Sequence, residues 1–348
     1  MPKPHVLARE FTRGELSEFL TLLVPGAELV GYEYLFGGLS TTTVWIKYEN
    51  DSSQKSVVAV LKIFFPNCPD LTSAETSMRI CSFIHEGNSG VKISYPLHSG
   101  KVQLVELVSD PLPKTQFPCI LMKHIGNAIA GNAEQVGVSE MKIILSDLGQ
   151  LLAEIHCIVP SPELPSFQQG GAVELARHSR GEFLTPIAQI GDPEFTKLYM
   201  NELPLFRDLD QFPVGIIHGD PFLDNVLVDK QTHKLAGLVD FEDACVGPVM
   251  FDIGSAIAGS CFTGSRLDFE KVQALVGGYV KHRKLSILEQ QAIPKFVRIA
   301  LVCNAAFRFL TYAGTANSDA FRDLADKLRC FSCEERSQQK LQDMQFPY

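Results

Sequence analysis

Two short segments of the sequence place polar side chains that could do chemistry beside apolar runs. They read GIIHGDPFLDNVLVD (215–229) and LAGLVDFEDACVGPVMFDIG (235–254). Burying an unpaired carboxylate costs several kcal/mol, so these acidic residues need cations, hydrogen bonds or an opening to water. Phosphoryl transfer needs a base for the attacking hydroxyl and hard oxygen ligands for Mg²⁺. Asp220, Asn225 and Asp240 supply these groups and predict a site for a magnesium-bound triphosphate.

The apolar runs beside these residues predict the elements that position them. The segments VGII (214–217), NVLV (225–228) and LAGLV (235–239) are short and rich in branched apolar side chains, as buried strands are. The candidate residues then lie on loops at strand ends, where catalytic groups usually sit on a rigid scaffold. A hairpin-like return would bring all three candidates to one edge.

The spacing of these residues resembles a known family. HGDPFLDN (218–225), followed by LVDFEDACVGPVMFD (238–252), is similar to the aminoglycoside phosphotransferase/choline kinase-like superfamily, which shares the pattern H-G-D-x-x-x-x-N with a later Asp. The resemblance implies an α+β, two-lobed protein-kinase-like fold, with an antiparallel sheet in a β-rich N-terminal lobe and a mainly helical C-terminal lobe. It covers most of the chain in element order, and its specific motifs lie in 215–254.

Within this superfamily, the two segments are most similar to homoserine kinases, whose loop reads D-L-F-x-D-N before a similar D-F-x-x-A-C segment. Phe222, Asp224 and Asn225 match that loop, while Pro221 replaces the usual Leu. Hydroxylysine kinases and other amino-alcohol kinases share much of the same frame. Protein kinases carry a Lys at the position of Phe222, so a protein substrate is disfavoured.

The resemblance implies a role for each polar residue of the two segments. Asp220 is the catalytic base, and Asn225 and Asp240 are Mg²⁺ ligands. His218 shapes the loop, and Asp252 steadies the loop backbone without contacting substrate. Asp220, Asn225 or Asp240 taken singly could be a turn or cap residue, but their joint spacing favours the functional interpretation.

Candidate nucleotide contacts come from the N-terminal part of the chain. Lys62 lies in the third predicted strand, where kinase-like folds place the Lys that pairs with phosphates. Glu75 could pair with Lys62 from the following helix, or could belong to a capping box with Thr72. Met122 lies in the expected hinge at 122–126.

A turn at FGGLSTTT (36–43) resembles the turn that covers phosphates. Gly37 and Gly38 allow close backbone approach, and Ser40 and Thr41 offer hydroxyls. The segment lacks the full G-x-G-x-x-G pattern.

Several charged residues are candidates for contacting the acceptor. Asp224, Glu242 and Asp243 lie near the predicted loop and could attract an ammonium group. Glu242 and Asp243 could instead face the metal, or could be solvated turn carboxylates. Arg308 lies on a late apolar helix and could bind a substrate carboxylate bidentately, or could be a satisfied core arginine.

The wider pattern of the sequence places these residues in two lobes, 1–124 for nucleotide binding and 125–348 for catalysis and substrate binding. The first contains a helix over 12–24 that begins with a capping box, a three-stranded antiparallel meander and a helix over 72–83. The expected strands of this lobe are 28–36, 41–48, 56–65, 101–108 and 118–124. From Ser139 a helical stripe begins, and the rest is mainly helical apart from the short strands.

Composition narrows the class of protein. The 348 residues carry a net charge of −9, with 45% hydrophobic and 20% charged residues, which is typical of a globular protein and argues against nucleic acid or anionic membrane as a partner. The nine cysteines are scattered, so we expect reduced thiols in a cytoplasmic protein; Cys330 and Cys333 form a C-x-x-C without a second pair. Neither a secretory signal nor a membrane span is apparent.

We therefore expect an ATP- and Mg²⁺-dependent kinase that phosphorylates a hydroxyl of an amino acid or amino alcohol, with homoserine as the first choice of acceptor. The alternatives within enzymes are a hydroxylysine kinase or a phosphotransferase of the choline, ethanolamine or aminoglycoside type. The alternative outside enzymes is an inactive kinase-like binding module. The presence of Lys62, Asp220, Asn225 and Asp240 together disfavours the last.

Overall fold

The computed structural model describes residues 10–35, 41–50, 55–64, 71–97, 102–107, 115–132, 136–167, 175–315 and 317–346. The described chain divides into two compact units. The first runs to Glu86 and includes Ile93–Gly126, and the second comprises Gly87–Lys92 and the chain from Asn127 onward. The segment Gly87–Lys92 is tied to the second unit because Leu238 N–H donates to the carbonyl of Lys92 at 2.9 Å. The predicted boundary between the lobes, after residue 124, lies two residues before Gly126, where the first unit ends.

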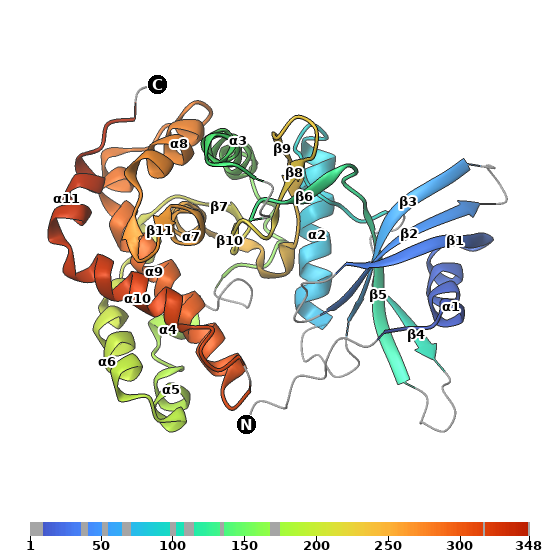
Figure 1. Ribbon diagram of the computed structural model, residues 1–348, viewed down its shortest axis with the longest axis horizontal. Helices are drawn as coiled ribbons and strands as arrows, with labels where there is room; N and C mark the ends of the chain where they lie inside the picture. The colour runs from blue at the N-terminus through green and yellow to red at the C-terminus, as the bar shows by residue number, and fades with distance from the viewer. Residues whose placement is uncertain are drawn as a thin grey trace. The chain divides into compact units, whose positions relative to one another are not determined.

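The first unit is built on an antiparallel sheet (Figure 1). Its strands lie in the order β1-β2-β3-β5-β4, so the predicted meander of the first three strands is confirmed, and β5 lies between β3 and β4. Most predicted limits differ from the observed ones by three residues or fewer. The strands are β1 (Ala27–Leu35), β2 (Thr41–Asn50), β3 (Lys55–Phe64), β4 (Gln103–Leu107) and β5 (Thr115–Lys123).

Two helices complete the first unit. Helix α1 (Arg13–Leu23) begins at the predicted capping box, in which Thr12 and Glu15 each accept a hydrogen bond from the other's backbone. Its buried face packs against the sheet, where Phe19 meets Phe117 of β5 edge to face at 6.2 Å between ring centroids. Helix α2 (Leu71–Gly87) is longer than predicted.

The second unit is mainly helical, as predicted. Its helices are α3 (Val138–His156), α4 (Leu175–Ser179), α5 (Leu184–Ile190), α6 (Pro193–Glu202), α7 (Met250–Ser260), α8 (Phe269–Val280), α9 (Ile287–Tyr312), α10 (Arg322–Cys333) and α11 (Glu335–Asp343). Its strands are short: β6 (Ala128–Ala130), β7 (Val214–Ile217), β8 (Val226–Asp229), β9 (Leu235–Leu238), β10 (Cys245–Pro248), β11 (Phe262–Thr263) and β12 (Arg266–Leu267).

Not all the short strands of the second unit pair with the strands that are next to them in sequence. The predicted hairpin is present between β8 and β9, and β6 lies on the other side of β8. Strand β7, however, pairs with β10 in a separate two-stranded sheet. Gly215 and Gly247 are partners in this register, and a Cβ atom on either would lie under 3 Å from a side-chain atom, of Val249 or Ile217 respectively. This close packing involves residues far apart in sequence.

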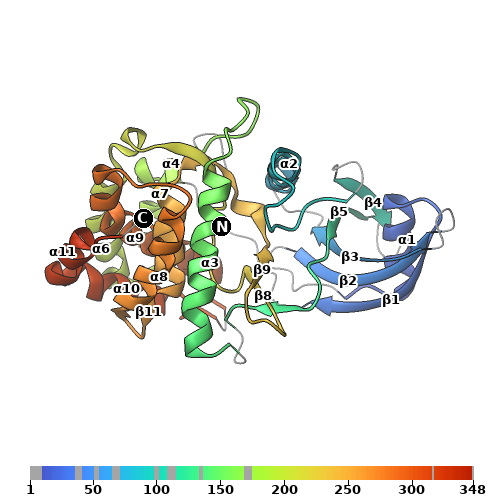
Figure 2. The ribbon, with the colours of Figure 1, turned by 90° about the horizontal axis from the view of Figure 1, so that it is seen from above.

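Close helix crossings build the core of the second unit. Helices α3 and α8 lie side by side (Figure 2), and a Cβ atom on Gly149 would come 2.0 Å from the carbonyl oxygen of Leu275. A Cβ atom on Gly278 would lie equally close to the carbonyl of Ser146. Only glycine at these positions allows the two backbones to approach so closely.

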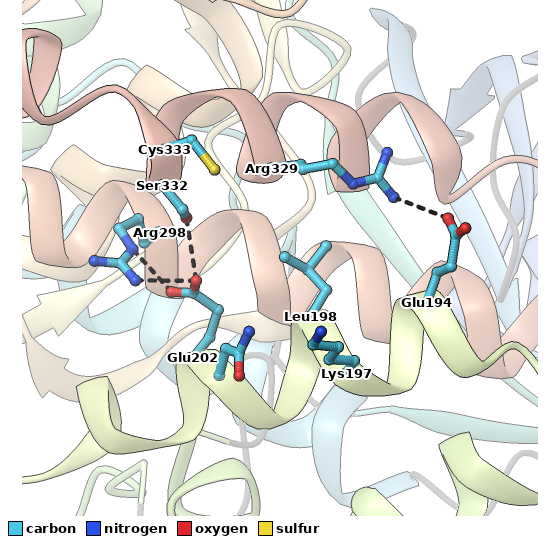
Figure 3. A pocket seen from close by; sticks show the side chains of 9 residues that line it. Glu194, Lys197, Leu198, Glu202, Arg298, Arg329, Ser332 and Cys333 are labelled. Atoms are coloured by element: carbon cyan, nitrogen blue, oxygen red, sulfur yellow. Dashed lines mark hydrogen bonds and ion pairs between the residues drawn. The ribbon is translucent and has the colours of Figure 1, made fainter.

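The polar residues that interrupt the apolar sequence of α9 are accommodated inside the unit. Arg298 forms a bidentate ion pair with buried Glu202, at 2.8 and 3.0 Å, and Ser332 also donates to Glu202 (Figure 3). Asn304 donates to the carbonyl of Ala300 in its own helix. Within the described part of the chain, none of the helices has the length and apolar character of a membrane span.

Helices α6, α9 and α10 also line a cavity of about 680 Å³ next to this ion pair (Figure 3). None of its lining residues is a predicted site residue. Cys333 is exposed at its edge and Cys330 is half-buried one turn earlier. Among the described residues, no group of three or more His, Cys, Asp and Glu side chains could hold a metal ion.

Candidate active site

The loop between β7 and β8 carries the predicted base, and a buried carboxylate from α7 holds its backbone. Asp252 accepts hydrogen bonds from the backbone N–H of His218 at 2.7 Å and from that of Gly219 at 2.8 Å. Gly219 has a φ of 90°, a conformation that L-residues with side chains rarely adopt. These two hydrogen bonds support the predicted role of Asp252 in steadying the loop backbone, and that role stays a prediction.

His218 connects this loop to the end of β9. Its Nε2 lies 2.9 Å from the carbonyl oxygen of Val239, and its Nδ1 accepts the backbone N–H of Asp220 at 3.2 Å. A carbonyl only accepts, so Nε2 must carry the proton, and Nδ1 must be unprotonated. The fully buried imidazole thus fixes the backbone of Asp220 relative to the residue that precedes Asp240.

Among the described residues, only one of the two carboxylate oxygens of Asp220 has a hydrogen-bond partner. The amide nitrogen of Asn225 lies 2.9 Å from the carbonyl oxygen of Asp220 and 3.3 Å from its Oδ2. Oδ1 of Asp220 is buried, and no described residue supplies a hydrogen-bond partner for this oxygen. Buried polar atoms are rarely left unsatisfied, so Oδ1 is suited to accept a hydrogen bond from a bound molecule.

The electrostatic surroundings of Asp220 are dominated by acidic residues. Burial raises the pKa of its carboxyl well above the usual range, and the charges of Asp243, Asp224 and Asp240 raise the pKa further. Arg308 of α9 acts in the opposite direction. This excess of negative charge would be relieved by a bound cation.

The predicted magnesium ligands fit such a cation. Because the nitrogen of the Asn225 amide is directed at Asp220, its oxygen remains as the ligand atom. Asp240 is half-buried and has the left-handed values φ 66° and ψ 64°, an uncommon backbone conformation that often marks functional sites. Mg²⁺ is commonly held by one or two protein oxygens, with phosphate oxygens and waters completing its shell. The roles of both residues remain predictions.

The candidate acceptor residues lie around the same loop. Asp224 and Asp243 are exposed and Glu242 is half-buried. Arg308 is half-buried, and no hydrogen bond or ion pair engages its guanidinium within the described ranges. The interpretation of Arg308 as a satisfied core arginine therefore finds no support. Its charge also lowers the pKa of Tyr312, against the larger raising effect of burial.

Sequence reasoning missed how the loop is anchored on its apolar side. Phe222 is buried, and its ring lies against Gly259 of α7 so closely that a Cβ atom there would come 2.6 Å from the ring. The available signal was a glycine inside an apolar helix. Glycine inside a helix lowers the stability of the helix by about 1 kcal/mol relative to alanine, and it often marks a place where close packing requires it.

The candidate nucleotide residues belong to the first unit. Lys62 is half-buried in β3, Glu75 is exposed in α2, and Met122 is buried in β5, paired with Val60. Thr41 is buried at the start of β2, with its hydroxyl 3.4 Å from that of Thr43. Gly37, Gly38 and Ser40 lie outside the described residues. All seven assignments remain predictions.

Comparison with known proteins decides the family. A model of the phosphotransferase enzyme family matches residues 33–285. The chain belongs to this phosphotransferase family. The family and the kinase-like fold predicted from residues 215–254 are thereby confirmed.

Homoserine kinases are among the proteins similar to this chain in sequence, and an ethanolamine kinase is among the solved structures similar to it in fold. A homoserine kinase of Rhodopseudomonas palustris (strain BisB5) is 37% identical over 102 residues, which cover 29% of each chain. A homoserine kinase of Methylobacillus flagellatus is 30% identical over 156 residues, or 44% of this chain and 47% of the relative. The match thus spans less than half of either relative. A solved ethanolamine kinase of Plasmodium vivax is 13% identical, with a TM-score of 0.61 over 96% of this chain and 92% of that one, which shows the fold alone.

Proposed function

We propose that this phosphotransferase is an ATP- and Mg²⁺-dependent kinase that phosphorylates the hydroxyl of a small amino acid, with L-homoserine as the favoured acceptor. Family membership supports phosphoryl transfer, and the names of the relatives support homoserine. The observation that carries the acceptor class is the guanidinium of Arg308, which none of the described residues engages and whose charge acts on Asp220. A free zwitterion has a carboxylate that such a group would bind, whereas an amino alcohol has none.

In this proposal Asp220 acts on the acceptor. The acceptor hydroxyl donates a hydrogen bond to Oδ1 of Asp220, which orients the hydroxyl oxygen and takes its proton as that oxygen bonds to the γ-phosphorus of ATP. The bond from the γ-phosphorus to the β-phosphate oxygen breaks in the same step, and ADP leaves. A raised pKa makes Asp220 a stronger proton acceptor than an ordinary aspartate. Mg²⁺ held by Asn225 and Asp240 would supply charge neutralisation on the phosphates, and Lys62 is the candidate for a second phosphate contact.

The remaining charged residues would select the acceptor. Arg308 would bind the carboxylate through two parallel N–H donors, a geometry that is specific for planar anions. Exposed Asp224 and Asp243 would attract the ammonium group. A choline- or ethanolamine-type acceptor could use the acidic residues but would leave Arg308 without a role.

Arg308→Ala and Arg308→Lys test this assignment. We expect the KM for L-homoserine to rise about tenfold or more in both variants, because Lys cannot form the bidentate pair, with the KM for ATP unchanged. Arg308→Lys keeps the positive charge that acts on Asp220, so turnover of ethanolamine, which lacks a carboxylate, should not respond to that substitution. An unchanged KM for the preferred amino acid in Arg308→Ala would contradict the carboxylate contact.

A further inference from the structure

A chain of buried polar side chains runs from α8 to the candidate catalytic loop. The hydroxyl of Tyr279 on α8 lies 2.8 Å from Nδ1 of His156, at the end of α3. Nε2 of His156 lies 3.1 Å from Oδ2 of Asp252, the carboxylate that holds the loop amides. Solvent reaches neither the His156 nor the Asp252 side chain, and Tyr279 is 1% exposed.

The chemistry of these groups fixes where the protons lie. An ionised carboxylate only accepts hydrogen bonds, so Nε2 of His156 carries a proton that it donates to Asp252. Burial raises the pKa of Tyr279, so its hydroxyl stays protonated. The hydroxyl can then donate to an unprotonated Nδ1, or accept from Nδ1–H if His156 is charged.

A cation lies beside the tyrosine ring. The guanidinium carbon of Arg283 lies 5.8 Å from the centroid of the Tyr279 ring. Arg283 is itself held by buried Glu289 at 2.7 Å, and Glu289 forms a capping box with Ser286 at the start of α9. The tyrosine hydroxyl and the Asp252 carboxylate together hold both ring nitrogens of His156, and a neutral ring with the tyrosine as donor pairs both nitrogens without a further buried charge.

The packing of α3 against α8 explains why Tyr279 reaches His156. The glycine at 278 precedes Tyr279 and lets α8 approach α3 closely, as does Gly149 on the facing helix. The partners Tyr279 and His156 are separated by 123 residues, and their contact depends on this crossing.

We propose that Tyr279 is a positioning residue for the catalytic loop: its hydroxyl holds His156 in the neutral Nε2–H tautomer, which directs Asp252 at the backbone amides of His218 and Gly219. The effect on turnover rests on the proposed kinase function. The effect on the loop itself does not, because protection of the two amides can be measured without any substrate.

A matched pair of variants tests this inference. Tyr279→Phe removes the hydroxyl and keeps the ring. Tyr199→Phe is the control, because Tyr199 is equally buried in the same unit and its hydroxyl lies 2.9 Å from Nδ1 of another buried histidine, His178, that does not contact Asp252. Both variants lose one buried tyrosine–histidine hydrogen bond.

Amide hydrogen exchange gives the first readout. We expect exchange at His218 and Gly219 to be about tenfold faster in Tyr279→Phe than in the wild type, and unchanged in Tyr199→Phe. Equal exchange at these two amides in both variants would overturn the inference. The kinase assay gives the second readout: kcat should fall in Tyr279→Phe with the KM for ATP unchanged, whereas a fall of the same size in both variants would contradict a positioning role.

Nitrogen NMR of the wild-type protein needs no variant and so does not depend on folding of Tyr279→Phe. With ¹⁵N-labelled histidine, His156 should show a protonated Nε2 and an unprotonated Nδ1 at neutral pH. A protonated Nδ1 would rule out the proposed tautomer. If the tautomer and the exchange results hold while no acceptor is phosphorylated, the proposed function fails and the loop inference stands.

Discussion

The ring of Phe222 lies against the backbone of Gly259, where a Cβ atom would come 2.6 Å from two of its ring atoms. Phe222 follows Asp220 by two positions in the candidate catalytic loop, and Gly259 is near the end of α7, seven residues after Asp252. One helix therefore holds this loop twice, through the hydrogen bonds that the loop amides donate to the Asp252 carboxylate and through apolar contact with Phe222. A small change in this helix should move the candidate base.

Gly259→Ala is the test of this contact. The added methyl group must displace Phe222, so we expect kcat to fall by about 10²-fold, the loss that a misplacement of about 1 Å can cause. Steady-state kinetics measures the effect. Gly277→Ala is the control, because a Cβ atom at Gly277 on α8 would meet only the end of the Gln273 side chain, at 3.9 Å. That variant should gain about 0.5–1 kcal/mol in stability and keep wild-type kcat; equal kcat in both variants would contradict the anchoring role.

Asp220→Asn should lower the rate of catalysis and at the same time raise the stability of the folded protein. Loss of the base should lower kcat by about 10²–10⁴-fold with nucleotide affinity nearly unchanged. The pKa of Asp220 is raised in the folded protein, so ionising it at neutral pH opposes folding. Asn removes this charge, and the melting temperature at neutral pH should rise by a few degrees.

The pH dependence of the melting temperature of Asp220→Asn tests the sign of this stabilisation directly. A group with a raised folded pKa favours the folded state fully below its unfolded pKa, about 3.9 for Asp, and loses that contribution as the pH rises through the folded value. The stability gained by Asp220→Asn should therefore be present at neutral pH and vanish below about pH 4. Calorimetry that showed a lower melting temperature for Asp220→Asn at neutral pH would contradict the electrostatic account.

Asp240→Ala tests the predicted metal ligand. Isothermal titration calorimetry should show that the wild type binds ATP more tightly with Mg²⁺ than without it, and that most of this difference is lost in the variant. Asp243→Ala is the control, because Asp243 is an exposed neighbour that also acts on the pKa of Asp220 but is not a predicted ligand. Equally metal-dependent binding in Asp240→Ala and the wild type would show that the assignment of Asp240 is wrong.

The sequence predicted those parts of the fold that depend on local pattern. Strand-like runs between turn residues located the strands of the first unit, and Thr12 with Glu15 marked the start of α1, because both signals are carried by neighbouring residues. The position of β5 between β3 and β4 and the pairing of β7 with β10 depend on contacts between distant residues. Neither could be inferred from the apolar runs.

The candidate site also has residues that the sequence predicted and residues that it did not. The family resemblance identified Asp220, Asn225, Asp240 and Asp252 because they lie in one contiguous motif region. Tyr279 and Gly259 escaped notice because their importance lies in partners elsewhere in the chain, His156 and Phe222. A tyrosine or a glycine in an apolar helix carries no local sign of such a partner.

The central claim is that the protein transfers phosphate from ATP to the hydroxyl of a small amino acid. The most direct measurement is kcat/KM with Mg·ATP for L-homoserine, hydroxylysine, ethanolamine, choline and an aminoglycoside, with the phosphorylated product identified by mass spectrometry and Asp220→Asn as the inactive control. The account predicts L-homoserine first and hydroxylysine second, with phosphate on the side-chain oxygen. A preference of about tenfold or more for choline, ethanolamine or the aminoglycoside over both amino acids, a difference of about 1.4 kcal/mol in transition-state stabilisation, would contradict it.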